Sequence, residues 1–85
     1  MDFVADFLNK VDMLFSQYAK DGVLDNYIKE YEDPEIAVGS KDSAYAWSAL
    51  DGMVHMYNTI MGSHIVFEET VNEKLGCSQF TFREE

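Results

Sequence analysis

A long row of mostly apolar residues in the middle of the chain is the feature that most restricts its fold. Its members recur at alternating spacings of four and three, which is the heptad period of a helix that packs along one face. They are Ala46, Leu50, Met53, Tyr57, Ile60, His64, Phe67 and Val71. The row predicts a helix that begins near Ser40 or Asp42 and continues beyond residue 70. Gly62 costs about 1 kcal/mol inside a helix, so a kink or break is expected there.

The second half of this row also fits a strand. The β-branched residues Ile65, Val66, Thr70 and Val71 favour extended structure, and residues 79–83 alternate in polarity as a strand does. A β-hairpin at about residues 64–83 is therefore the alternative, and it would make the fold α+β. We favour the helix, because the heptad spacing is kept for nearly four repeats.

Two shorter helices are predicted before the long one. Residues 3–18 carry apolar side chains at helical spacing, and Gly22 lies just beyond their end. Residues 23–32 repeat the pattern more briefly and stop before Pro34, since the residue preceding a proline is pushed out of the helical region. A short linker, residues 34–40, then leads to the third helix.

The predicted fold is therefore all-α. It is a single acidic helical domain, residues 1–85, in which three main helices form a small bundle, the third long and broken near Gly62, with a short extended C-terminal tail. Cys77 is the only cysteine, so no internal disulfide can form. The lone thiol, the lack of a signal peptide and the lack of a long apolar run predict a soluble, cytoplasmic protein.

The charge balance restricts the partners. The chain has 16 acidic and 6 basic residues and a formal net charge of −10. Nucleic acid and anionic membranes repel such a chain, so direct binding to either is not expected. The acids cluster in the stretch EYEDPE and again between residues 68 and 73. These clusters give the candidate partner-binding residues Glu30, Glu32, Asp33, Glu35, Glu68, Glu69 and Glu73.

A protein-interaction module is the first functional hypothesis. Its acidic surface would dock on a basic surface of a partner protein, including one that the partner uses for nucleic acid, and would inhibit that partner. In composition the chain is similar to small acidic inhibitors encoded by phages, such as anti-CRISPR proteins and DNA mimics. The similarity implies an inhibitor of this type.

Self-assembly is the alternative. The second half of the apolar row extends beyond the reach of the two shorter helices, and a second copy of the chain could cover it by two-fold symmetry. The candidate self-association seam consists of Ile60, His64, Phe67 and Val71. The chain would then be a helical structural subunit or adaptor, a homodimer, with no inhibitory role.

The motifs of catalysis and metal binding are missing. The chain has no phosphate-binding glycine loop, no CxxC and no HExxH. Asp51 and His55 lie one helical turn apart and could form half of a metal or acid–base site, but the other histidine, His64, is too distant in sequence to complete it. A calcium loop beginning at Asp21 fails because Val23 occupies a ligand position. A small enzyme or metal protein is the third hypothesis, and we expect no enzymatic activity, cofactor or metal.

Overall fold

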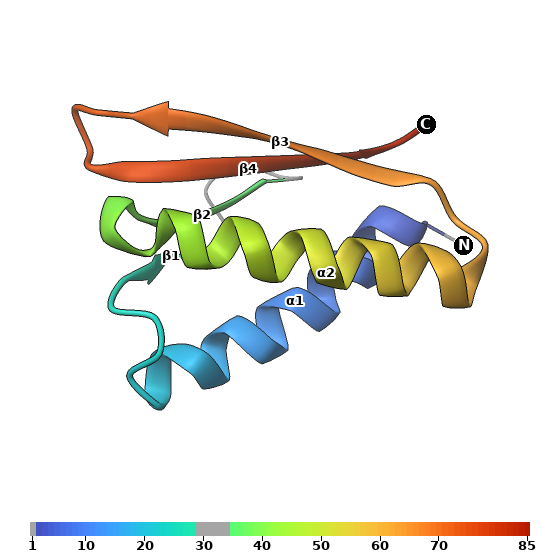
Figure 1. Ribbon diagram of the computed structural model, residues 1–85, viewed down its shortest axis with the longest axis horizontal. Helices are drawn as coiled ribbons and strands as arrows, with labels where there is room; N and C mark the ends of the chain where they lie inside the picture. Colours follow the sequence, from blue (N-terminus) through green and yellow to red (C-terminus); the bar gives the residue numbers. More distant parts are fainter. Residues whose placement is uncertain (1, 29–34) are drawn as a thin grey trace.

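The computed structural model describes residues 2–28 and 35–85 and has an α+β fold. Along the chain the elements are α1 (Phe3–Lys20), β1 (Tyr27–Ile28), β2 (Glu35–Gly39), the 3₁₀ turn η1 (Ser40–Asp42), α2 (Ser43–Met61), β3 (Ile65–Asn72) and β4 (Cys77–Glu84). The four strands form one antiparallel sheet in the order β1–β2–β4–β3 (Figure 1). The eight-residue strand β3 therefore forms one edge of the sheet.

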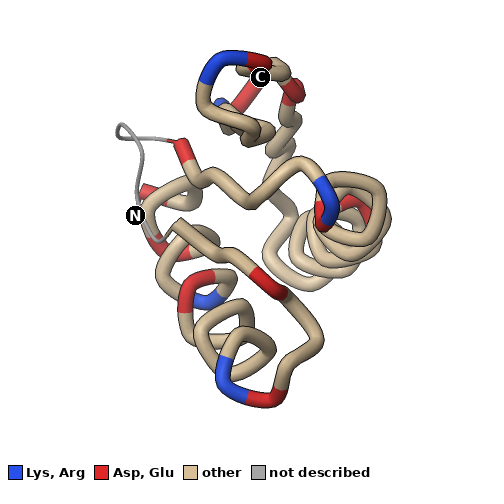
Figure 2. Tube along the Cα trace, turned by 90° about the vertical axis from the view of Figure 1, so that its left-hand side faces the viewer, with Lys and Arg blue, Asp and Glu red and all other residues tan. Residues whose placement is uncertain are grey.

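Both helices pack on the same face of the sheet. On β3 and β4, Phe67 and Phe82 are register partners and lie on this face. The Phe67 ring is 6.0 Å from Trp47 of α2, and the Phe82 ring is 5.5 Å from Phe7 of α1. Figure 1 shows α2 running below the β3–β4 hairpin with α1 crossing beneath it, and Figure 2 shows the same layers from the side. The molecule thus has two layers, and the other face of the sheet carries no helix among the described residues.

The hydrophobic core lies between these two layers. Its fully buried large side chains come from both helices, three of the strands and the segment between α1 and β1. They include Phe7, Val11, Phe15, Leu24, Ile36, Val38, Leu50, Ile65, Phe80 and Phe82. Neither helix in the described part of the chain is both long and apolar enough to cross a membrane.

The first predicted helix is confirmed. Residues 3–18 lie within α1, and Phe7, Val11 and Phe15 form its buried stripe. Asp2 caps the helix, because its Oδ1 accepts a hydrogen bond from the N–H of Ala5 at 3.1 Å. Local periodicity and capping are sufficient to define this element.

The predicted all-α bundle is wrong, and the alternative hairpin is present in its place. The third helix ends at Met61, where Gly62 adopts the left-handed conformation with φ of 65°. The chain then turns back into β3, which pairs with β4 over its whole length. A spacing of four places Phe67 and Val71 on one face of a strand as well as on one face of a helix, so the row from Ala46 onward did not distinguish the two.

The predicted second helix is also absent from the described residues. Residues 21–25 form turns and bends, and Tyr27 and Ile28 form the short strand β1. The carboxylate of Asp42 is buried and accepts hydrogen bonds from the N–H groups of Asp25 and Asn26 at 2.9 and 3.0 Å. This contact with a distant residue holds the segment in a turn. Part of the expected linker, Glu35–Gly39, is strand β2.

Candidate protein-binding site

The open edge of β3 begins beside a single side chain of α2. Asn58 Oδ1 accepts a hydrogen bond from the N–H of Ile65 at 2.9 Å, and Asn58 Nδ2 donates one to the carbonyl oxygen of Ile65 at 2.9 Å. Ser63 Oγ donates a further bond to Asn58 Oδ1 at 2.8 Å. The amide of Asn58 therefore takes the place that a neighbouring strand would occupy at the first residue of β3.

The contacts of Ile65 fix the direction in which the backbone of β3 points. In an antiparallel pair, the N–H and C=O groups of successive residues alternate between the partner strand and the opposite side. The groups of Ile65 point away from β4, and the preceding carbonyl, that of His64, accepts a bond from Glu85 N–H at 2.9 Å. The backbone groups of Phe67, Glu69 and Val71 consequently face the open edge. Within the described residues these groups have no hydrogen-bond partner.

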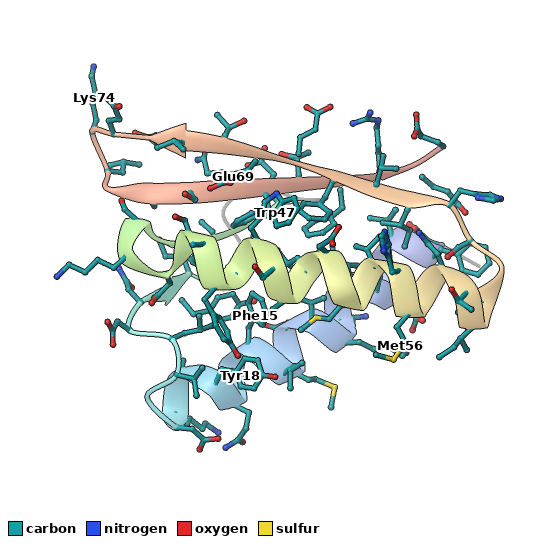
Figure 3. The ribbon with its side chains drawn as sticks, in the orientation of Figure 1. Phe15, Tyr18, Trp47, Met56, Glu69 and Lys74 are labelled. Carbon is teal, nitrogen blue, oxygen red and sulfur yellow. The ribbon has the colours of Figure 1, made fainter. Side chains whose placement is uncertain are left out.

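A groove runs between this edge strand and α2. It encloses about 370 Å³ and is lined by Trp47, Asp51, Val54, His55, Asn58, Ile65, Val66 and Phe67. Trp47 lines the groove with 45% of its surface exposed, and Figure 3 shows it between α2 and the β3–β4 hairpin. A half-exposed tryptophan is a favourable anchor for a protein partner, because it buries a large area with few rotatable bonds.

The β3–β4 hairpin, whose strand β3 lines this groove, is rich in acidic side chains. Its charged residues from position 68 onward are Glu68, Glu69, Glu73, Lys74, Arg83, Glu84 and Glu85. Arg83 forms an ion pair with Glu68 at 2.9 Å, and both side chains are largely exposed. Lys74 lies at the tip of the hairpin and points away from it (Figure 3). Glu69, Glu73 and Glu85 form no ion pair with any described residue, so this part of the molecule has an excess of negative charge.

The structure separates the acidic residues that the sequence groups together. Glu30, Glu32 and Asp33 lie outside the described residues. Glu35 and Glu68 flank Thr81 in one row across the face of the sheet opposite the helices, where Thr81 Oγ1 donates to Glu35 Oε1 at 2.9 Å. The other two members, Glu69 and Glu73, lie on the helix-facing side of β3 and in the hairpin turn.

The predicted self-association seam does not exist as one row. Ile60 is exposed on α2, and His64 lies in the turn that follows this helix. Phe67 is half-buried and packs against Phe80 and Phe82 of β4, with ring centroids 6.1 and 5.6 Å away. The seam requires a continuous helix, whereas the chain reverses at Gly62 and Phe67 packs beside the aromatic rings of the C-terminal strand.

A second, apolar groove lies between α1 and α2. It encloses about 270 Å³ and is lined by Phe7, Lys10, Val11, Leu14, Met53, Met56, Tyr57, Ile60 and Met61. Met56 and Ile60 are 61% and 71% exposed at its rim (Figure 3 shows Met56 below α2). Lys10, its one charged lining residue, is paired with Asp6 at 2.8 Å.

Tyr57, which lines this second groove, takes part in a carboxylate–phenol hydrogen bond. Tyr57 O–H donates to Asp6 Oδ2 at 2.7 Å. Burial of the hydroxyl, together with this bond, raises the pKa of Tyr57 to about 12. The hydrogen bond from Lys10 and the bond from Tyr57 lower the pKa of Asp6. The contact therefore joins α1 to α2 with a neutral phenol and an ionised carboxylate at neutral pH.

Comparison with known proteins gives no further guide to these sites. No protein-family model, curated protein or solved structure shows significant similarity to the chain. Within residues 2–28 and 35–85, no three histidine, cysteine, aspartate or glutamate side chains come together in a way that could hold a metal ion. Asp51 and His55, the pair noted in the sequence, line the groove beside β3.

Sequence reasoning missed the two features that define the first site. It did not single out Trp47 as a binding residue, and it did not recognise an open strand edge. The β-branched residues of β3 were the available signal for a strand at this place.

Proposed function

We propose that this chain is an acidic protein-interaction module that docks on a basic surface of a partner protein through the β3–β4 hairpin. The observation that carries the proposal is the excess of carboxylates on the hairpin whose strand β3 lines the groove that contains Trp47. Exposed charges of one sign speed the encounter with a partner of opposite sign, and the aromatic anchor supplies buried area once contact is made.

Inhibition follows if the occupied basic surface is one that the partner uses for nucleic acid. The acidic module and the nucleic acid would then compete for the same cations. A cytoplasmic setting is part of this proposal, because the single thiol of Cys77 suits a reducing compartment. A short DNA duplex should release the partner from the module, whereas an uncharged polymer should not.

The acidic hairpin should determine salt-dependent capture. Replacing Glu69 and Glu73 by glutamine should reduce capture of the partner from a lysate by about 3- to 10-fold at low ionic strength, because charges at the rim of an interface act mainly through steering. The difference from the unaltered protein should shrink at about 0.5 M salt, where the Debye length falls to a few ångströms. Quantitative mass spectrometry of the retained proteins provides the measurement.

A matched control removes the same charge elsewhere. Asp21→Asn with Asp25→Asn also neutralises two exposed carboxylates, on the segment that leads into β1 at the opposite edge of the sheet. This variant should retain capture close to that of the unaltered protein. Equal losses in the two variants would show that net charge alone matters, and would contradict docking through the hairpin.

Self-association through the groove between α1 and α2 is a second candidate function. Met13, Leu14, Met56 and Ile60 are exposed on the two helices around this groove, and soluble monomers rarely expose large contiguous apolar patches. The occupant that fits best is a second copy of the chain. The total charge of −10 opposes contact between copies. At this groove the opposition is weaker, because the one charged lining residue, Lys10, is already paired with Asp6.

Ile60→Asp tests this candidate. Ile60 is 71% exposed, so the folded monomer should tolerate aspartate, while a carboxylate placed in an apolar self-contact should weaken association at least about 10-fold. Sedimentation velocity of both proteins at tens of micromolar measures the outcome, with Thr59→Asp as a neighbouring charge control. An unaltered protein that sediments as a monomer would exclude the second candidate and leave the first intact.

A further inference from the structure

We propose that the open edge of β3 accepts an extended segment of the partner as a fifth strand, and that this segment reads apolar–x–basic–x–apolar. The inference rests on the proposed function and specifies how the acidic hairpin recognises its partner. Addition of a strand to a sheet edge supplies affinity through backbone hydrogen bonds, and the alternate side chains supply specificity.

The backbone of β3 provides the template. The N–H and C=O groups of Phe67, Glu69 and Val71 face the edge and have no partner within the described residues, as the alternation from Ile65 requires. Asn58 already occupies the groups of Ile65. The accessible template therefore runs from Phe67 to Val71, long enough for about five residues of an added strand.

The side chains of the same three residues specify the segment. Because side chains alternate along a strand, Phe67, Glu69 and Val71 all lie on the helix-facing side of the sheet. A residue added opposite Phe67 lies near Trp47 and the groove, and one opposite Val71 meets a 59% exposed aliphatic side chain. A residue opposite Glu69 meets a carboxylate with no ion pair among the described residues. An added strand with apolar, basic and apolar residues at alternate positions therefore complements Phe67, Glu69 and Val71. The pattern is the same in either strand direction.

A second copy of β3 is a poor occupant of this edge. A two-fold antiparallel pairing that uses the whole template puts Phe67 opposite Val71 of the other copy and Glu69 opposite its own counterpart. Like charges directly opposite each other are destabilising. Glu69 therefore disfavours self-pairing and favours a lysine or arginine in the added strand.

Two synthetic peptides test the proposal. The blocked peptide TVTKTVT carries the required pattern, and TVTETVT differs only in the central charge. Titration of the full isotope-labelled chain, followed by amide exchange at up to about 5 mM peptide, detects affinities into the millimolar range. With the lysine peptide, exchange should slow at Phe67, Glu69 and Val71, and binding should be at least about fivefold tighter than with the glutamate peptide. Equal affinities, protection elsewhere or no binding would overturn the proposal.

Two variants separate strand addition from acidic docking in general. Val71→Pro removes an N–H that faces the open edge and leaves both the ladder to β4 and the charge of the hairpin unchanged. Val71→Thr keeps the N–H and serves as its control. Val71→Pro should weaken binding of the lysine peptide at least about fivefold, and Val71→Thr should leave the affinity unchanged. If Val71→Pro still binds the peptide normally, strand addition is wrong. Equal loss of capture in the glutamine variant and in its Asp21→Asn and Asp25→Asn control would contradict the proposed function and would leave the peptide result unaffected.

Discussion

Replacing Phe82 by alanine should destabilise the protein by about 3–5 kcal/mol, because it removes a fully buried aromatic ring and leaves a cavity. The Phe82 ring lies 5.5 Å from Phe7 and 5.6 Å from Phe67, so it joins β4 to α1 and to β3. A domain of this size has a total stability of about 5–10 kcal/mol. The variant should therefore be close to unfolding at room temperature.

Urea unfolding followed by circular dichroism measures this effect. Phe82→Leu should lose about 1–2 kcal/mol, since leucine retains much of the buried volume, and it keeps the prediction measurable if the alanine variant does not fold. Val71→Ala should change stability by less than about 0.5 kcal/mol, because Val71 is 59% exposed. A loss below about 1 kcal/mol in Phe82→Ala would contradict the two-layer core.

The extent to which the fold could be predicted differs between its two halves. The helix α1 is defined by local signals, a 3.6-residue apolar period and a capping aspartate, and both are visible in the sequence. The end of α2 is also marked locally by Gly62, but continuation of the apolar spacing beyond it hid the boundary. A strand and a helix both place residues four apart on one face, so only the β-branched composition of β3 favoured the strand.

The turn before β1 could not be predicted for a different reason. Residues 23–28 contain Val23, Leu24, Tyr27 and Ile28 at helical spacing, yet the segment is fixed by the buried carboxylate of Asp42. Propensity reasoning treats each segment alone, and a hydrogen bond across such a separation in sequence overrides it.

The candidate site was predictable only in its charge. The sequence identifies the acidic residues, including Glu69 and Glu73, but it cannot show that Glu69 lies on the helix-facing side of the sheet and Glu68 on the other. That assignment depends on the register between β3 and β4. The availability of the β3 edge depends on the strand order, which is also a property of the whole fold.

Replacing Asn58 by alanine should cost about 2–3 kcal/mol, because it leaves both backbone groups of Ile65 and the hydroxyl of Ser63 without their partner in a partly buried position. Amide exchange should accelerate at Ile65 and change little at Val66, whose N–H points toward β4 by the same alternation. Thr59→Ala, a neighbouring change on the exposed side of α2, should have little effect on stability or on the exchange of these amides.

The same variant also tests why the template for an added strand begins at Phe67. Asn58 occupies the first edge position in the unaltered protein, so its removal frees the N–H and C=O of Ile65 for a partner. In Asn58→Ala, a lysine peptide extended by two residues of the same alternation at each end, TVTVTKTVTVT, should protect the amide of Ile65 in addition to those of Phe67, Glu69 and Val71. If the amide of Ile65 in this variant exchanges at the same rate with and without bound peptide, the added strand does not extend to Ile65. The side chain of Asn58 then does not set the limit of the site.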